Sequence, residues 1–370
     1  MYGPKAIGLL GLITLASQVR WIQEAYTDAN KLVNLAGVNS GIDWNSASAL
    51  EYLGPSALNK DQQSQIQAVL ANVATVKDGA AWWTPNWIRI RCDDPLRRCS
   101  KCVTPQEDED QAVVVAYARN PAQTGQKYPD ISFCPPFYGL RNLDNAMAYG
   151  SGFSNAKNKF DLSNYEGRAD TFLHELLHLD LAANSVNNNP NPQVRDLSIR
   201  YGSTNPTGPR WTKVYGPKLT KILARFLPIS RVSTQTGYFI QRSDDNLVLF
   251  ALANYVQSKL GYYPWLPLVF DGLTDAPKVP PNHQSTDPFI GYTSNGNNPV
   301  DFVNFTTADN GGARNLEDSG NCPTVLSTGS GEDLDIGAPN PTDAYPSSYW
   351  DQRTKWLQSL DGGATVDTGS

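Results

Sequence analysis

The sequence predicts an α+β protein that is mainly helical and contains a small mixed sheet. Apolar residues recur at three- and four-residue spacing between about Val19 and Asp78, and again from Asn164 onward, as in amphipathic helices. Short runs of β-branched and aromatic residues, separated by Pro, Gly and acidic residues, lie between Trp82 and Tyr138. Hydrophobic residues make up 40% of the 370-residue chain, which is enough to form a sizeable core.

The chain begins with a short basic segment and an apolar run of eleven residues, Ala6 to Ala16. This run is too short to cross a bilayer, and small residues precede Ser17 as they do at signal-peptidase sites. We therefore expect residues 1–17 to be a signal peptide, and the mature protein to be a soluble, secreted, extracellular monomer. The alternative is a buried N-terminal helix.

The predicted elements follow in chain order. Two or three helices are expected before residue 78, and a helix that begins near Asn164 presents Leu and Phe side chains to the core. In a later helix, Asp244 or Asp245 is expected to cap the N-terminus. The remaining expected elements are strands in residues 86–91, 112–117 and 131–133, and helices over about 217–226 and 244–259.

We expect a folded domain over residues 18–280 and an acidic, low-complexity, largely disordered tail over 281–370. The tail holds 12 acidic and 3 basic residues, so it carries a charge of −9 while the rest of the chain carries +3. Only Tyr349-Trp350 and Lys355-Trp356-Leu357 are expected to form a short docked helix there. No basic stripe with interleaved aromatic residues is present, which argues against nucleic acid as a partner.

The five cysteines indicate structural disulfides in an exported protein. Cys99 and Cys102 could also belong to a zinc ribbon or a redox pair, but no second pair with this spacing follows. Four of the five cysteines lie close together in the sequence, and their pairing is left open: Cys92, Cys99, Cys102 and Cys134, with Cys322 far downstream.

The segment His174-Glu175-Leu176-Leu177-His178 points most directly to a function. On a helix, residues four apart share a face, so both imidazoles can bind one metal ion while Glu175 stands beside them as a general base. The chain has only three His, and two of them stand at this spacing. The alternative is a buried helix with two hydrogen-bonded histidines.

The third metal ligand can be approached by elimination. A metzincin would need Gly and His where Leu181 and Asn184 stand, and a thermolysin-like site would need a Glu, but none occurs between Glu175 and Glu317. Asp180 lies about 200° round the helix from His178 and cannot face the same ion.

The remaining donors are Asp196, Asp244, Asp245 and His283. His283 lies in a Pro-rich segment without regular structure, and the other two aspartates have a competing role as helix caps. Asp196 follows a turn that would let the chain return beneath the helix, so we select Asp196 as the third ligand and keep the others as alternatives.

A metal set of His174, His178 and Asp196 on an exported chain resembles the aspzincin metallopeptidases, the deuterolysin family of fungal secreted proteases. Tyr215-Gly216 before a helix resembles the Tyr-Gly of that family, and the segment 244–251 resembles its Asn-Ala-Asp-x-Tyr-x-x-Phe-Ala. The likeness covers about residues 60–260. It implies a zincin-like fold with the sheet packed on the motif helix, a Zn²⁺ ion, and a Tyr215 phenol that donates to the oxyanion.

The chain departs from the family pattern Gly-Thr-x-Asp-x-x-Tyr-Gly. Thr212 stands three residues before Tyr215, where the family has its ligand Asp. Either Asp196 has taken that role across an insertion, or the site is degenerate. A second Tyr-Gly pair, Tyr201-Gly202, is an alternative to Tyr215-Gly216.

The sequence thus predicts a zinc metalloendopeptidase that hydrolyses protein or peptide substrates, with Glu175 activating a zinc-bound water. A catalytically inactive, zincin-like binding or structural protein is the alternative. A zinc hydrolase acting on another amide or ester is a third possibility. The sequence indicates no cleavage specificity.

Overall fold

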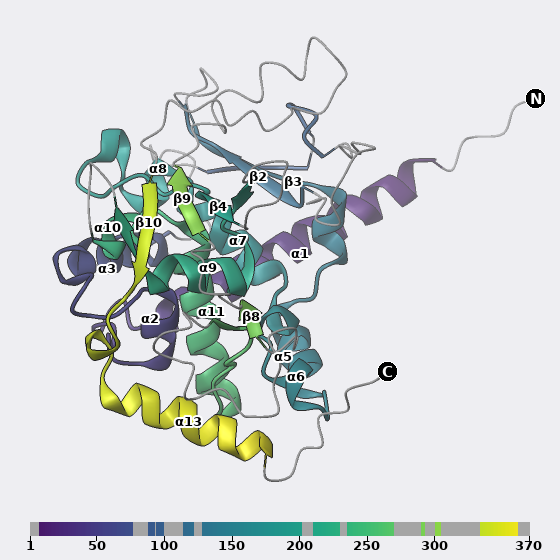
Figure 1. The fold of residues 1–370 in the computed structure, drawn as a ribbon. Helices are drawn as coiled ribbons and strands as arrows, with labels where there is room; N and C mark the ends of the chain where they lie inside the picture. Colours follow the sequence, from purple (N-terminus) through teal and green to yellow (C-terminus); the bar gives the residue numbers. More distant parts are fainter. Residues whose placement is uncertain are drawn as a thin grey trace, which may run out of the picture.

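The fold is described from a computed structural model of the 370-residue chain. It describes residues 7–76, 88–92, 94–99, 114–121, 128–201, 210–229, 235–269, 290–292, 300–304 and 334–361. These residues form a mixed, mostly helical structure with a small mixed sheet, which confirms the predicted α+β class. Figure 1 shows the arrangement of the helices and sheets.

Three helices form the N-terminal part, as predicted: α1 (Ile7–Leu35), α2 (Ala47–Tyr52) and α3 (Gln63–Ala74), the last preceded by the 3-10 turn η1 (Lys60–Gln62). Ala25, Ala29 and Leu32 of α1 are fully buried. Arg168 binds Glu24 of α1 at 2.8 Å, which ties α1 to the motif helix. Residues 7–17 of the expected signal peptide lie in α1, and the first six lie outside the described residues.

The small mixed sheet has the order β1-β3-β2, with β1 (Arg89–Arg91) parallel to β3 (Asp130–Phe133) and β2 (Ala116–Arg119) antiparallel to it. Phe133 stacks on Phe172 of the motif helix, with ring centroids 5.2 Å apart. The Asn120 amide, directly after β2, donates to the carbonyl of His178 at 2.8 Å. The sheet therefore packs on the helix that carries the two histidines.

A disulfide joins Cys99 to Cys134, which confirms that a disulfide lies within the predicted cluster. It links the loop after β1 to the end of β3. Cys92 is a free, exposed thiol. Cys102 and Cys322 lie outside the described residues.

Short helices follow the sheet and lead into the motif helix α7 (Arg168–Leu177). The helix α11 (Asp244–Leu260) contacts α1, α2, α7 and α9, and most of its side chains are buried. Figure 1 shows it below α9. The other helical elements are η2 (Pro135–Gly139), α5 (Leu143–Ser151), α6 (Ala156–Lys159), η3 (Leu162–Tyr165), α8 (Asp180–Ala183), η4 (Val186–Asn188), α9 (Gly216–Arg225) and α10 (Thr236–Ile240).

A second sheet, which the sequence did not predict, has the order β5-β4-β9-β10-β6 with antiparallel pairing throughout. Two of its strands come from the expected tail and pair with strands of the preceding domain. The strands are β4 (Ser198–Tyr201), β5 (Arg210–Lys213), β6 (Phe226–Ile229), β9 (Val300–Asn304) and β10 (Leu334–Pro339), and a separate parallel pair joins β7 (Leu268–Val269) to β8 (Ile290–Tyr292).

The docked helix expected in the tail is α13 (Ser347–Asp361), which follows the turn η6 (Thr342–Ala344). Tyr349 and Arg353 are each only 1% exposed and belong to the interior of the domain. The expected docked helix is therefore longer than predicted, and the strand β10 before it was not predicted. Most of 281–333 lies outside the described residues.

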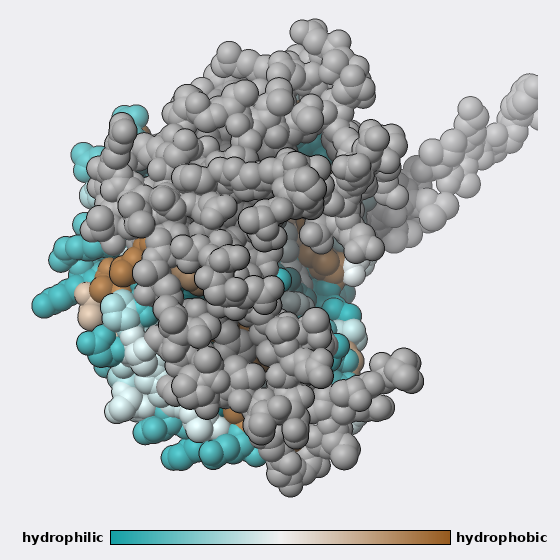
Figure 2. All heavy atoms as spheres, viewed as in Figure 1, coloured by the Kyte–Doolittle hydropathy of each residue, from teal (hydrophilic) through white to brown (hydrophobic). Residues whose placement is uncertain are grey.

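Among the described residues, none of the helices combines the length and the apolar character that a membrane crossing requires. Figure 2 shows that the described part of one face is largely polar, with hydrophobic residues visible only in small, separate areas.

Candidate metal centre

The helix α7 presents both motif histidines on one face. Phe172, Leu173 and Leu176 are at most 2% exposed and anchor the opposite face in the core. The rings of His174 and His178 have centroids 4.8 Å apart, and their Nε2 atoms are 3.2 Å apart. The i, i+4 spacing therefore brings two imidazole nitrogens to one point, as the sequence predicted.

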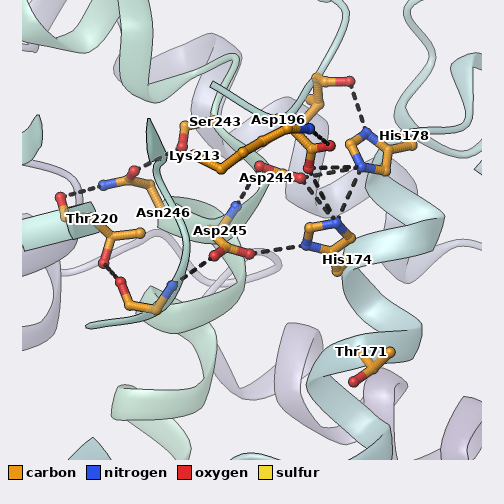
Figure 3. A network of polar contacts seen from close by, with 12 residues as sticks. Thr171, His174, His178, Asp196, Lys213, Thr220, Ser243, Asp244, Asp245 and Asn246 are labelled. Atoms are coloured by element: carbon orange, nitrogen blue, oxygen red, sulfur yellow. Dashed lines mark hydrogen bonds and ion pairs between the residues drawn. The ribbon is translucent and has the colours of Figure 1, made fainter. Parts of the chain in front are cut away.

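Two carboxylates from distant parts of the chain meet these histidines. The Oδ1 atom of Asp196 lies 3.4 Å from each Nε2, and the Oδ2 atom of Asp244 lies 3.1 Å from each Nε2. Asp196 precedes β4, and Asp244 is the first residue of α11. Figure 3 shows both side chains directed at the pair of imidazoles.

The four donor atoms fit a metal ion. All lie within 4.8 Å of one another, and the five distances above fall between 3.1 and 3.4 Å. A tetrahedral ion with bonds of about 2.0–2.2 Å would hold its donor atoms about 3.3–3.6 Å apart, close to these five distances. Asp196 Oδ1 and Asp244 Oδ2 are buried without a hydrogen-bond partner, a costly state that a bound cation would relieve. His174, His178, Asp196 and Asp244 could therefore hold a metal ion.

The outer nitrogens of both imidazoles are fixed by the protein. His174 Nδ1 contacts Asp245 Oδ1 at 2.9 Å, and His178 Nδ1 lies 3.3 Å from the carbonyl oxygen of Val194. Both partners are acceptors, so each Nδ1 can donate a proton to them, which would leave each Nε2 to bind a metal ion in place of its own proton. Asp245 is thus an orienting residue rather than a donor to the ion, and its second oxygen accepts the amide of Gly216 at 2.9 Å.

A β-hairpin holds Asp196. The strands β4 and β5 pair so that Ser198 lies opposite Lys213, and the amide of Val214 donates to the carbonyl of Leu197 at 2.8 Å. This register brings Lys213 Nζ to 2.6 Å from Asp196 Oδ2. One oxygen of Asp196 therefore binds a lysine while the other faces the histidines.

The site is strongly anionic. Burial would raise the pKa of Asp196, but His178, His174 and Lys213 hold it well below its usual range. Burial would lower the pKa values of both histidines, but Asp244, Asp196 and Asp245 hold them well above 6.5. Clustered carboxylates that favour positive charge on the imidazoles equally favour a divalent cation.

Glu175, the residue that follows His174 on α7, is buried. Its side chain is 5% exposed, and its Oε2 atom has no hydrogen-bond partner. Burial raises its pKa to about 7, although His174 and His178 act in the opposite direction. A carboxylate with a pKa near neutrality can both take up and release a proton at physiological pH.

Tyr215 lies at the edge of the site. It is 38% exposed, and its ring centroid is 6.1 Å from that of His174. Gly216 has a φ of +73°, which a side chain would disfavour, and this turn leads directly into α9. Tyr201 is instead the last residue of β4, and the structure describes only its backbone. His283 lies outside the described residues.

The expected capping role of Asp244 and Asp245 is wrong. Ser243 is the N-cap residue of α11, although its side chain makes no capping hydrogen bond. Asp244 Oδ1 accepts the amide of Asp245, while Asp244 Oδ2 and Asp245 Oδ1 face His174. The sequence offered Asp244 only as an alternative to Asp196, whereas the structure brings the two together. Asp180, which helix geometry excluded, binds Ser185 and Gln193 instead.

Comparison with known proteins gives no family for this chain. No protein-family model matches it, and no curated protein matches it.

Proposed function

We propose that this protein is a secreted zinc-dependent endopeptidase of aspzincin type. The observation that carries the proposal is the convergence of two imidazoles and buried, unpartnered carboxylate oxygens on one point, next to the buried Glu175. His174, His178 and Asp196 would hold the ion. Zn²⁺ bound there would supply Lewis acidity, lowering the pKa of water towards about 7 and polarising a peptide carbonyl.

The residues of the chain then carry the proton transfers. Glu175 accepts the proton of the attacking water and returns it to the leaving amine, a role that its pKa of about 7 favours. Tyr215 donates a hydrogen bond from its hydroxyl group to the developing oxyanion and keeps its proton, from its place beside His174.

The hairpin supports the aspzincin resemblance. The strands β4 and β5 and their connection occupy residues 198–213, and the amide of Val214 binds the carbonyl of Leu197 at the base of the hairpin. If this hairpin were removed, Asp196-Leu197 would continue into Val214-Tyr215-Gly216, which has the Asp-x-x-Tyr-Gly spacing of the family. An inserted hairpin therefore accounts for the displaced aspartate.

The test combines metal analysis with casein hydrolysis on the purified protein. One zinc per chain and cleavage that a chelator abolishes would support the proposal. Asp196→Ala is expected to lose zinc and activity together. Zinc without any cleavage would contradict it.

A second candidate, a zincin-like binding or structural protein without catalysis, is favoured by one observation. Asp244 supplies a fourth donor, and four protein ligands are typical of structural zinc sites. In that case zinc removal would unfold the protein, and Glu175→Gln would change no measurable property of the zinc-loaded protein other than its stability.

A further inference from the structure

The metal centre has one donor more than a hydrolytic zinc site uses. A catalytic zinc takes three protein ligands and keeps a fourth position for water. Here the donors of His174, His178, Asp196 and Asp244 all lie together. Asp244 Oδ2 is closer to the two imidazole nitrogens than Asp196 Oδ1, at 3.1 Å against 3.4 Å. An ion that bound all four donors in tetrahedral geometry would have no position left for water.

We propose that Asp244 is a displaceable fourth ligand that occupies the coordination position of the reacting water, so that the resting site is closed and Asp244 must leave the metal before a peptide is cleaved. This inference rests on the proposed peptidase function, because a structural site has no need to open.

The position of Asp244 suits a metal ligand better than a helix cap. Its side chain is 1% exposed, and Oδ2 is buried without a hydrogen-bond partner while it faces both Nε2 atoms. The N-cap position of α11 belongs to Ser243. The two imidazoles, and any cation that they bind, would therefore be the positively charged neighbours of Oδ2.

The same position gives the carboxylate an alternative set of partners. Asp244 opens the 17-residue helix α11, and its Oδ1 already accepts the amide of Asp245 at 2.8 Å. The first amides of a helix have no partner within the helix, and the helix dipole favours a negative charge there. A rotation of the side chain can move the carboxylate from the metal to these amides.

Asp196 lacks this freedom. Lys213 holds its outer oxygen at 2.6 Å, and the hairpin fixes Lys213 opposite Ser198. Of the two aspartates, Asp196 is therefore the permanent ligand and Asp244 the one that leaves.

Cobalt substitution tests the proposal without relying on activity. The full chain is loaded with Co²⁺, whose visible absorption reports coordination geometry, and is titrated with azide, a small anion that binds an open metal position. The wild type is expected to show the intense absorption of a four-coordinate ion and to resist azide. Asp244→Ala is expected to bind azide with a clear spectral change, and to bind zinc about 10- to 100-fold more weakly than the wild type.

Two further variants complete the design. Asp244→Asn keeps the side-chain volume but removes a strong ligand, and should behave like Asp244→Ala. Asp180→Ala removes a carboxylate that binds Ser185 and Gln193, and should match the wild type. With saturating zinc, Asp244→Ala is expected to cleave casein faster than the wild type, because the position of the reacting water is then open.

Several results would overturn the proposal. Equal azide binding by the wild type and Asp244→Ala would show that Asp244 is not on the metal. Failure of both Asp244 variants to fold or to hold metal, or a loaded Asp244→Ala that opens to azide but cleaves more slowly, would show that Asp244 is not displaceable. If neither protein cleaves casein while azide still distinguishes them, the peptidase function fails and the ligand assignment stands.

Discussion

Two buried clusters of charged residues lie at opposite ends of α9, and they are built in opposite ways. At the N-terminal end, the metal centre gathers carboxylates whose inward oxygens have no hydrogen-bond partner. At the C-terminal end, the cluster of Glu51, Lys221, Arg225, Tyr349 and Arg353, here called the ionic cluster, surrounds one carboxylate with cations.

The ionic cluster satisfies its own charge. Lys221 Nζ donates to Glu51 and to the carbonyls of Trp265 and Pro267, at 3.1, 2.9 and 3.2 Å. Glu51 also accepts a hydrogen bond from the hydroxyl group of Tyr349. Burial would raise the pKa of Glu51, but Lys221, Arg353 and Arg225 hold it below its usual value.

The difference separates a site that receives a cation from one that completes the fold. Lysine and arginine side chains neutralise the charge of Glu51. At the metal centre, by contrast, the inward carboxylate oxygens of Asp196 and Asp244 converge with the two imidazoles on a point that a metal ion could occupy. We expect perturbations of the first cluster to change stability and perturbations of the second to change chemistry.

The largest effect is expected from the two buried glutamates. Glu175→Gln removes the proposed base and should lower casein hydrolysis by roughly 10²- to 10⁴-fold while zinc content stays unchanged. Glu51→Gln, the matched control, should lower stability but leave the specific activity of the folded protein unchanged. The measurement is kcat with metal analysis on both variants. Full activity in Glu175→Gln would remove this residue from the mechanism.

The two lysines that bind carboxylates give the next test. Lys221→Met leaves Glu51 buried without its nearest cation, so we expect a loss of about 3–5 kcal/mol in the free energy of unfolding and no change in zinc affinity. Lys213 is 27% exposed at its side chain, so Lys213→Met should cost about 1 kcal/mol or less. Urea unfolding measures both. The comparison fails if Lys221→Met weakens zinc binding as much as it weakens the fold.

Metal removal should act through the metal centre alone. An ion that binds only the folded state stabilises it by about 2.7 kcal/mol when its free concentration is 100 times its Kd. A chelator should therefore lower the thermal midpoint of the wild type and of Lys221→Met alike. His178→Ala should show no such dependence, because it has lost a donor atom. If the chelator does not change the thermal midpoint of the wild type, the cluster binds no metal.

Local spacing predicted the parts of both regions that depend on neighbouring residues. The helix α7 and its histidine pair follow from apolar periodicity and the i, i+4 rule. Asp196 was reached by eliminating other donors, because few ligand residues stand between His178 and the tail.

Long-range pairing accounts for what the sequence missed. Asp244 reaches the metal centre because α11 begins beside α7. This contact depends on tertiary packing, which the spacing of residues along the sequence does not predict. Tyr349 meets Glu51 across 298 residues, so the composition of the tail concealed the role of α13. The strands of the second sheet are too short for their alternation to identify them, and β9 and β10 pair with strands far back in the chain.

The last prediction concerns the pH dependence of stability at Asp170, one turn before His174 on α7. Burial raises its pKa to about 7 from 3.8, although the amide of Gly167 stabilises the charged form. Below a pH of about 4, Asp170 is protonated in both the folded and the unfolded chain. As the pH rises from about 4 to about 7, only the unfolded chain loses this proton, so Asp170 lowers the stability over this interval and has no further effect above it.

Asp170→Asn keeps an acceptor for Gly167 but cannot ionise. The variant should therefore lose less stability than the wild type as the pH rises through this interval, and each pKa unit corresponds to about 1.4 kcal/mol. Urea unfolding of the metal-free proteins across the interval measures the slope, with the exposed Asp351→Asn of α13 as control. Parallel stability curves for the wild type and Asp170→Asn would contradict the raised pKa. A shallower slope for Asp170→Asn, with no change for the control, would show that ionising the Asp170 carboxyl destabilises the folded protein. In the ionic cluster, by contrast, nearby cations stabilise the charged form of Glu51.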